Sequence, residues 1–329
     1  MVNVTYLVNG LSKTSIPWRW SSFFNKHSKN YYVSLLEIKK IFKLSSDIKI
    51  VHGHHIKAMF IFLVLNIFFR KKSVYTVHGS YLFLSKSNTK LLKYIFIKSD
   101  KVIFVNQQLY NVLPIEMKKI IQNKYEIVLN GVETDYNYVD SDVYNKFQIN
   151  KEDIILFHPA RFVTEKNHIK ILSALKILIK YNNKIKLVLA GDGKLKEEIT
   201  TYISDNNLED NVYMLGLIER DEVYSFLKRC DIFLMPSISE GLNIAFLEAI
   251  SMNCRILVSN IEQFTYPIES YNLNPIDLNI MFVNPLDEEE IAQTISLLLK
   301  QEKNLSYDCL EFSLSTMIQK YETIYNELI

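Results

Sequence analysis

Two glutamates eight positions apart stand on a loop and on the helix that follows it. The stretch "MPSISEGLNIAFLEA" (235–249) carries Glu240 before a helical pattern and Glu248 inside it. The apolar run that precedes it predicts a buried strand ended by Pro236, and the apolar residues from Leu242 onwards recur at helical spacing. Because ligands of parallel sheets bind where strands end and helices begin, this unit predicts a binding site.

The start of that helix is suited to a phosphate group. Its first backbone N–H groups have no partner within the helix, and the helix dipole is positive there. Gly241 lets a ligand approach the backbone closely. Glu240 can accept hydrogen bonds from hydroxyls attached to the phosphates, and Glu248, about 10 Å further along the helix, can accept them from a second polyol such as a ribose. This pattern describes a nucleotide-sugar site; the alternative is a surface helix with two solvated glutamates.

A diphosphate also needs cations, and another strand end offers them. The stretch "PARFVTEKNH" (159–168) leaves an apolar strand pattern and places Arg161 and Lys166 at the start of a helix. Guanidinium and ammonium groups there can neutralise the charge of a leaving diphosphate. A glycine-bearing turn, "AGDG" (190–193), ends a further strand. Each of these stretches, taken alone, is equally compatible with an ordinary loop.

Together, these motifs in their order and spacing, with "MLGLIERDEVYSFLKRCDIFLMPS" between them, resemble the large retaining glycosyltransferase family 4. That family has the GT-B fold and a glycogen-synthase-like C-terminal domain. The resemblance covers residues 154–261 and extends to "VLNGVETD" (128–135) and to the final helical pattern "FSLSTMIQKYETIYNELI" (312–329). It implies retaining transfer of a sugar from a nucleotide-diphosphate sugar without a metal ion.

The resemblance also implies a role for each matching residue. Glu240 and His78 contact the donor sugar, and Glu248 contacts the ribose. Arg161 and Lys166 bind the diphosphate. The residues expected to complete the donor site through their backbones or by close approach are Gly10, Gly216, Ile218, Gly241, Leu242, Asn243 and Ile244. Many relatives carry a double glycine where this chain has only Gly10, which is a departure from the family pattern.

No metal site is expected. His52 and His54 in "VHGHH" (51–55) share one face of a strand, but they have no cysteine or compact carboxylate partner in the sequence. The resemblance instead places histidines here near the acceptor. "DSD" (140–142) matches the D-x-D metal motif of the other large glycosyltransferase fold, but it lies in a polar linker and follows no strand pattern. The three cysteines lack paired spacing, which argues against a disulfide framework or a zinc site.

Strand and helix patterns alternate in two series along the 329 residues. Such alternation predicts parallel sheets with helices on both faces, and the length suits two domains. We expect an α/β protein of the GT-B type, in which two doubly wound Rossmann-like domains face a central cleft. The expected divisions are an acceptor-binding domain over residues 1–150, a nucleotide-sugar-binding domain over 151–310, and a final helix over 311–329 that crosses back to the first domain.

The charge is unevenly distributed, although the net charge is only +2. Residues 1–100 hold 16 Lys and Arg against 3 Asp and Glu, an excess of 13 positive charges, so the rest of the chain carries an excess of 11 negative ones. A basic first half predicts an anionic partner, either nucleic acid or a membrane. The apolar run 58–69 is closed by cations but is too short to span a bilayer; it predicts a buried crossover helix or one partly open to the membrane interface.

The resemblance implies a retaining, metal-independent hexosyltransferase. Its partners are expected to be a UDP- or GDP-sugar donor, a polysaccharide or lipid-linked oligosaccharide precursor as acceptor, and an anionic membrane surface, but not nucleic acid. The N-terminus shows no basic region of a signal peptide, so we expect a cytoplasmic protein on the inner face of the cell membrane. A nucleotide-sugar epimerase of similar fold and a non-catalytic subunit of a membrane glycosylation complex remain the alternatives.

Overall fold

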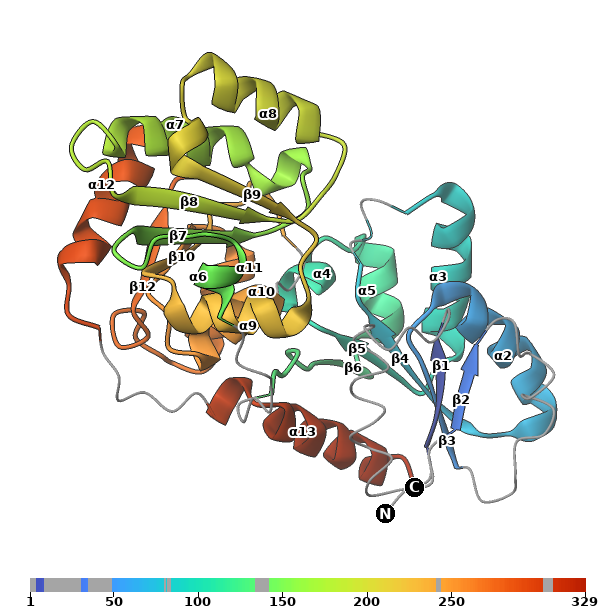
Figure 1. The fold of residues 1–329 in the computed structure, drawn as a ribbon. Helices are drawn as coiled ribbons and strands as arrows, with labels where there is room; N and C mark the ends of the chain where they lie inside the picture. The colour runs from blue at the N-terminus through green and yellow to red at the C-terminus, as the bar shows by residue number, and fades with distance from the viewer. Residues whose placement is uncertain are drawn as a thin grey trace. The chain divides into compact units, whose positions relative to one another are not determined.

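The computed structural model describes residues 4–8, 31–34, 49–79, 81, 84–133, 142–240, 244–303 and 310–329. The chain divides into two compact units, each with its own sheet (Figure 1). Unit 1 consists of residues 1–130 and 315–329, and unit 2 consists of residues 131–314.

The first division lies at residue 130, earlier than the residue 150 expected from the sequence. The segment between them belongs to unit 2 because its apolar residues are buried there. Val143 and Tyr144 lie in a core cluster of unit 2, where the Tyr144 ring contacts that of Phe226 at 6.5 Å between centroids. Residues 315–329, which include most of the last helix, belong to unit 1.

Unit 1 is built around a six-stranded parallel sheet in the order β2-β1-β3-β4-β5-β6. Parallel neighbours need crossover connections, and helices supply them between the later strands. The elements are β1 (Val4–Val8), β2 (Tyr31–Ser34), β3 (Ile50–Gly53), α2 (Ile56–Phe69), β4 (Lys72–Val77), α3 (Lys86–Lys98), β5 (Lys101–Phe104), α4 (Gln107–Asn111), α5 (Ile115–Ile121), β6 (Tyr125–Ile127) and α13 (Leu314–Glu327).

Unit 2 contains a second six-stranded parallel sheet, in the order β12-β11-β10-β7-β8-β9. The chain starts in the middle at β7, builds outward to β9, then returns to the other side of β7 with β10. The elements are α6 (Val143–Lys146), β7 (Ile154–Pro159), η3 (Thr164–Lys166), α7 (His168–Leu178), β8 (Ile185–Ala190), α8 (Lys196–Asp205), η4 (Glu209–Asn211), β9 (Val212–Gly216), α9 (Arg220–Arg229), β10 (Ile232–Met235), α10 (Ile244–Ser251), β11 (Ile256–Ser259), α11 (Glu262–Ser270), β12 (Ile280–Val283), α12 (Glu288–Lys300) and η5 (Leu310–Phe312).

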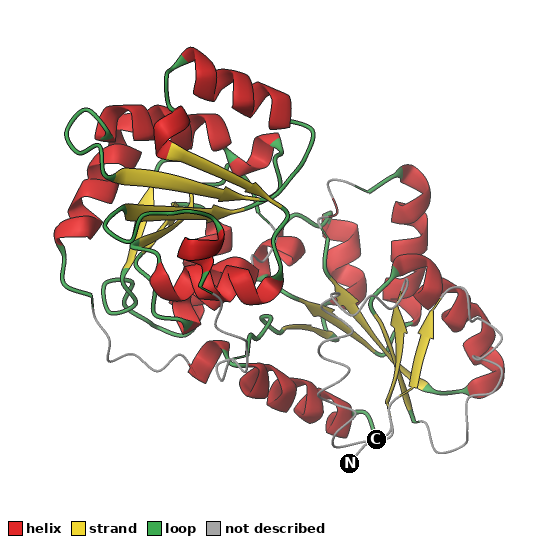
Figure 2. Ribbon diagram, in the orientation of Figure 1, coloured by secondary structure: helices red, strands yellow, loops and turns green. Residues whose placement is uncertain are grey.

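Helices cover both faces of the unit 2 sheet (Figure 2). Successive strand residues point to opposite faces, so Ile155 and Phe157 of β7 enter one core cluster and Leu156 enters the other. The first cluster includes residues of α9 and α10, and the second includes residues of α7, α8 and α12. Burial on both faces explains why these strands are continuously apolar in the sequence.

Helix α2 is the crossover from β3 to β4, and its apolar residues are only partly buried. Met59 and Phe62 are fully buried, whereas Ile67 is 72% exposed and Phe68 is 81% exposed. The interpretation of this segment as a helix buried between strands is therefore correct for one face only. Among the described residues, no helix has both the length and the apolar character needed to cross a membrane.

A buried hydrogen-bonded network fastens α13 to the sheet of unit 1. His52 in β3 lies 2.6 Å from the Tyr325 hydroxyl through Nδ1 and 2.7 Å from the Thr76 hydroxyl through Nε2. Thr76 Oγ1 in turn lies 3.3 Å from the hydroxyl of Tyr321. Tyr321 and Tyr325 come from α13, so this histidine has a structural role and not the acceptor contact expected of the "VHGHH" stretch.

Burial keeps several histidines of both units uncharged. It lowers the pKa of His52 to about 3, with a smaller contribution from His78. In unit 2, burial lowers the pKa of His158 to about 4 and that of His168 to about 2. Since unfolded histidine titrates near 6.5, the unfolded chain binds more protons than the native one between about pH 4 and 6.5.

We expect the free energy of unfolding to fall steeply as the pH is lowered from about 6.5 to 4. Each buried histidine contributes up to about 1.4 kcal/mol per pH unit in that window, because protons favour the unfolded state. Urea titrations at successive pH values measure this slope. His52→Gln should reduce it in unit 1, and His55→Gln, which changes a less buried histidine, should reduce it less. An unchanged slope in His52→Gln would show that His52 is protonated in the native state.

Candidate active site

Three of the predicted donor residues, Arg161, Lys166 and Glu240, lie at the carboxyl ends of β7 and β10 in unit 2. These strands are neighbours, but the chain leaves β7 toward β8 and leaves β10 toward β11 on the other side. In open parallel sheets, ligands bind in the crevice at such a switch point. The loop after β7 carries Arg161 and Lys166, and the loop after β10 carries Glu240.

Lys166 and Glu240 form an ion pair that is largely shielded from solvent. The Lys166 ammonium, at the end of η3, donates to Oε1 of Glu240, and their side chains are only 14% and 7% exposed. The Ser237 hydroxyl donates to the same oxygen at 2.6 Å. The sequence assigned the two charged residues to different parts of one ligand, and the structure brings their side chains into direct contact.

Backbone and amide contacts hold the two loops together around this pair. The amide of Ile238 donates to the carbonyl of Glu165 at 2.8 Å. Asn167 has a left-handed backbone, with φ of 62°, and its side-chain amide donates to the carbonyls of Pro236 at 2.9 Å and Pro285 at 2.6 Å. The loops therefore fix the positions of the charged groups before any ligand binds, which is the arrangement that electrostatic catalysis requires.

Arg161 lies at the same strand end but is exposed. The "AGDG" turn packs against the backbone on either side of Arg161. A Cβ at Gly191 would lie 2.0 Å from the carbonyl oxygen of Ala160, and one at Gly193 would lie 2.5 Å from that of Phe162. Only glycine permits these approaches. The turn thus positions the loop that carries the cations, while the Arg161 guanidinium is open to solvent for an anionic group.

Two of the residues expected to complete the donor site, Gly216 and Ile218, lie at the end of β9 and just after it. Gly216 has a left-handed backbone, with φ of 67°, and its carbonyl accepts a hydrogen bond from the amide of Gly191 at 2.8 Å. Ile218 packs against the first core cluster, as does Ile244 at the start of α10. Four further predicted residues lie outside the described residues: Gly10, Gly241, Leu242 and Asn243.

Glu248 is buried in α10 and is bound by two residues of α9 that the sequence interpretation missed. The Arg220 guanidinium donates to Oε1 of Glu248, and the Tyr224 hydroxyl donates to the same atom at 3.2 Å. Arg220 Nε also donates to the Tyr224 hydroxyl at 2.6 Å. A buried carboxylate requires a cationic partner, and Arg220 and Tyr224 share a helix face at i, i+4. That spacing was the available signal for this cluster.

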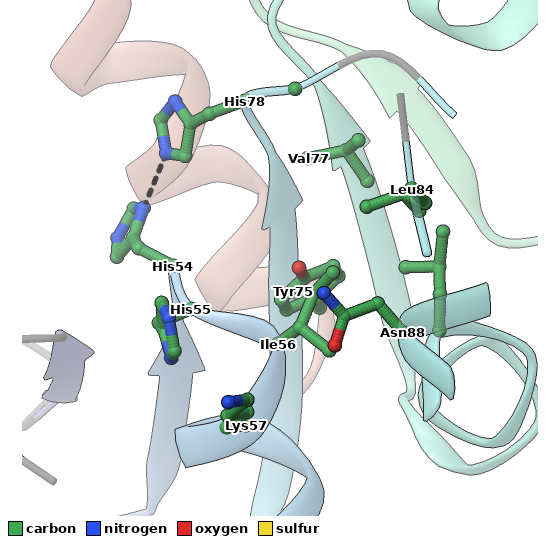
Figure 3. Close-up of a pocket in the computed structure, with 11 residues that line it drawn as sticks. His54, His55, Ile56, Lys57, Tyr75, Val77, His78, Leu84 and Asn88 are labelled. Atoms are coloured by element: carbon green, nitrogen blue, oxygen red, sulfur yellow. Dashed lines mark hydrogen bonds between the residues drawn. The ribbon is translucent and has the colours of Figure 1, made fainter. Parts of the chain in front are cut away.

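Unit 1 has a pocket of about 200 Å³ at the carboxyl ends of β3 and β4 (Figure 3). His54 and His78 follow these strands, and Nδ1 of His54 lies 2.9 Å from Nε2 of His78. Burial lowers the pKa of His78 to about 4 and that of His54 well below its usual value, so both rings are neutral and one donates to the other. The lining residues are His54, His55, Ile56, Lys57, Tyr75, Val77, His78, Gly79, Leu84, Asn88 and Leu92.

No cluster of three or more histidine, cysteine or carboxylate side chains that could hold a metal ion exists within the described parts of the chain. Asp142, the last residue of the "DSD" stretch, accepts a hydrogen bond from the amide of Asn145 at 3.2 Å and caps α6. The role of this aspartate is therefore that of a helix cap. The other two residues of the stretch lie outside the described residues.

We expect Lys166→Ala to lower the free energy of unfolding by about 3 kcal/mol, because it leaves the Glu240 carboxylate buried without its cation. Arg161→Ala, at an exposed position of the same loop, should change it by no more than about 0.5 kcal/mol. Urea unfolding measures both values. The double variant Lys166→Met with Glu240→Gln should recover part of the loss. Equal stability of the two alanine variants would contradict the ion pair.

Comparison with known proteins identifies the family of the chain. The family profile of Glycosyl transferases group 1 matches residues 141–310, and that of Glycosyltransferase Family 4 matches residues 8–136. The chain is 27% identical over 310 residues to an uncharacterized glycosyltransferase of Methanocaldococcus jannaschii, covering 91% of this chain and 81% of that protein. It is 28% identical over 247 residues to the capsular polysaccharide biosynthesis glycosyltransferase CapH of Staphylococcus aureus, covering 74% of this chain and 64% of CapH.

The fold is also that of solved glycosyltransferases. The crystal structure of Anabaena HepE in complex with UDP and glucose superposes with a TM-score of 0.75 at 14% identity, covering 99% of this chain and 100% of HepE. This likeness extends over both units and establishes the GT-B architecture. With a family profile that spans more than half of its length, the chain belongs to the group 1 glycosyltransferases.

Proposed function

We propose that this glycosyltransferase moves a hexose-type sugar from a nucleotide-diphosphate sugar to a polysaccharide or lipid-linked oligosaccharide precursor, with retention at the anomeric carbon and without a metal ion. The observation that carries the proposal is the Lys166–Glu240 pair at the switch point of unit 2, with Arg161 exposed on the same loop. The pair places a carboxylate for sugar hydroxyls directly beside a cation for phosphate oxygens.

The chemistry of the donor follows from this arrangement. An ammonium group has three N–H donors, and Lys166 directs one of them to Glu240, so others remain to bind a diphosphate. As the glycosidic bond breaks, negative charge grows on the departing diphosphate, and Lys166 and Arg161 stabilise it. Glu240 orients the sugar by accepting hydrogen bonds from its hydroxyls, while Glu248, held by Arg220, accepts hydrogen bonds from those of the ribose.

The donor and acceptor classes draw on the relatives as well as on the pocket in unit 1. HepE was crystallised with UDP and glucose, and CapH is named for capsular polysaccharide biosynthesis. We therefore take UDP as the first donor nucleotide to test, with GDP as the second. The 200 Å³ pocket is smaller than sites for whole drug-sized ligands, so it suits one part of an acceptor. Its neutral His78 and His54 can exchange hydrogen bonds with hydroxyl groups.

The proposed place of work is the cytoplasmic face of the cell membrane. The excess of 13 positive charges in residues 1–100 supports it, because anionic lipids of that leaflet attract basic surfaces. Lipid-linked precursors are presented there, and peripheral attachment would bring the enzyme to them.

We expect Glu240→Gln to lower kcat for sugar transfer by about a hundredfold and to leave the affinity for UDP or GDP nearly unchanged, because Glu240 contacts the sugar and not the nucleotide. Turnover of the radiolabelled donor and calorimetry with the free nucleotide measure the two effects, and NMR of the product reports its anomeric configuration. Glu248→Ala is the matched contrast. It should weaken nucleotide binding about tenfold or more, since it removes the ribose partner.

An equal loss of nucleotide affinity in Glu240→Gln would remove Glu240 from the sugar. Wild-type protein that binds the nucleotide sugar but transfers nothing to any acceptor would favour a non-catalytic subunit, and release of an epimerised donor would favour an epimerase.

Transfer should continue at an unchanged rate in EDTA, because Arg161 and Lys166 supply the positive charge that a divalent cation supplies elsewhere. The control is the same assay after addition of manganese or magnesium in excess over EDTA. Loss of transfer in EDTA and its recovery with the cation would contradict the metal-independent mechanism.

A further inference from the structure

Four apolar side chains of unit 1 are exposed at one end of two neighbouring helices. Val64, Ile67 and Phe68 of α2 are 42%, 72% and 81% exposed, and Ile97 of α3 is 51% exposed. Positions i, i+3 and i+4 lie on one face of a helix. Phe60 and Tyr94 join the two helices at 5.1 Å between ring centroids. An apolar group of this kind on a protein surface marks an interaction site.

The position of this group in the fold follows from the crossovers. Helix α2 leads from the end of β3 to the start of β4, and α3 leads from the end of β4 to the start of β5 (Figure 1). The last residues of both helices therefore lie at the amino edge of the sheet, where its strands begin. The pocket with His54 and His78 lies at the opposite, carboxyl edge.

Cations also lie at the amino edge of the sheet. Lys49, Lys72, Lys101 and Lys124 stand at or immediately before the starts of four neighbouring strands. The amide of Lys72 donates to the carbonyl of Lys49 at 3.0 Å, and that of Val102 donates to the carbonyl of Lys124 at 2.9 Å, so these strand starts adjoin.

The ends of the two helices add Arg70, Lys71 and Lys98 to the edge. Within the described part of this edge, the ion pairs join Asp100 to Lys72, and Glu126 and Glu327 to Lys101. The excess of 13 positive charges in residues 1–100 agrees with a positively charged edge.

The geometry points to this amino-edge surface, formed by Val64, Ile67, Phe68 and Ile97 with Lys49, Arg70, Lys71 and Lys98, as the docking site for an anionic lipid bilayer. Aliphatic and aromatic side chains rimmed by lysine and arginine suit the membrane interface, where the apolar groups enter the acyl boundary and the cations meet lipid phosphates. A second copy of the same surface would oppose like charges. Nucleic acid would leave Val64 and Ile67 without a stacking role.

Helix α3 contributes only its end to this surface. Residues 90–98 of α3 combine apolar residues with Lys90, Lys93 and Lys98, but Leu92, Ile95 and Phe96 are buried in unit 1. Only Ile97 of that stretch presents a largely exposed apolar side chain. The docking residues therefore lie at the helix ends and not along the face of α3. The inference deepens the proposed function and rests on it only for the identity of the acceptor.

Co-sedimentation with vesicles tests the surface. The full-length protein should bind vesicles of phosphatidylglycerol and phosphatidylcholine, and the bound fraction should fall as the salt concentration rises. It should not bind vesicles of pure phosphatidylcholine. Ile67→Ser with Phe68→Ser should weaken binding to the anionic vesicles at least tenfold. The matched control is Tyr181→Ser with Leu286→Ser, which changes two exposed apolar side chains of unit 2 and should bind like wild type.

Insertion of the apolar side chains into the bilayer is measured separately, by fluorescence. The fluorescence of a tryptophan introduced by Phe68→Trp should shift to shorter wavelength with anionic vesicles. Equal binding of the double variant and wild type, binding to neutral vesicles, or no shift would overturn the inference. So would a wild-type dimer that Ile67→Ser with Phe68→Ser converts to monomer in ultracentrifugation. Transfer to a water-soluble acceptor is unaffected by docking, so failure there would count against the proposed function alone.

Discussion

The ion pair between Lys166 and Glu240 joins two loops that stand 74 residues apart in the chain. Removing two charges from water is costly, and their mutual attraction offsets that cost only when the geometry is good and other hydrogen bonds complete it. Ser237 and the backbone contacts between the loops provide that completion. The switch point of the sheet thus holds a carboxylate and an ammonium group side by side, the two groups that the proposed function assigns to a sugar and a phosphate.

A second carboxylate of unit 2 is also held by a cation from another element. Glu248 depends on Arg220 and Tyr224 from a different helix, as Glu240 depends on Lys166 from a different loop. In each case a carboxylate that would bind hydroxyls is first bound by a cation of unit 2. Arg220 is 44% exposed, whereas Glu248 is only 4% exposed, so the guanidinium forms the solvent side of the pair. The sequence motif does not include Arg220, although this residue holds the carboxylate to which we assign the ribose.

Much of the fold and part of the candidate site could be predicted from the sequence, because buried parallel strands and helical spacing leave clear patterns. The two sheets, the cations after β7 and the two glutamates around α10 were all visible in that way. The partners of the charged groups were not, since they depend on which strands become neighbours in the sheet. His52 shows the same limit: its strand was recognisable, but its contact with α13 joins residues 273 positions apart. The boundary at residue 130 was missed because a polar linker says little about which core its few apolar residues join.

The sheet of unit 1 also acts as a spacer. Its pocket opens at the carboxyl edge and its apolar, cationic surface lies at the amino edge, so the two are separated by the length of a strand. Strand β4 has six residues, which corresponds to about 20 Å. A protein that rests on lipid through one edge therefore presents the other at a fixed height above the headgroups. If the protein docks in this way, sugars attached directly to a lipid would lie below the pocket and the outer sugars of a longer chain would reach it, so the fold itself would select acceptors by their height.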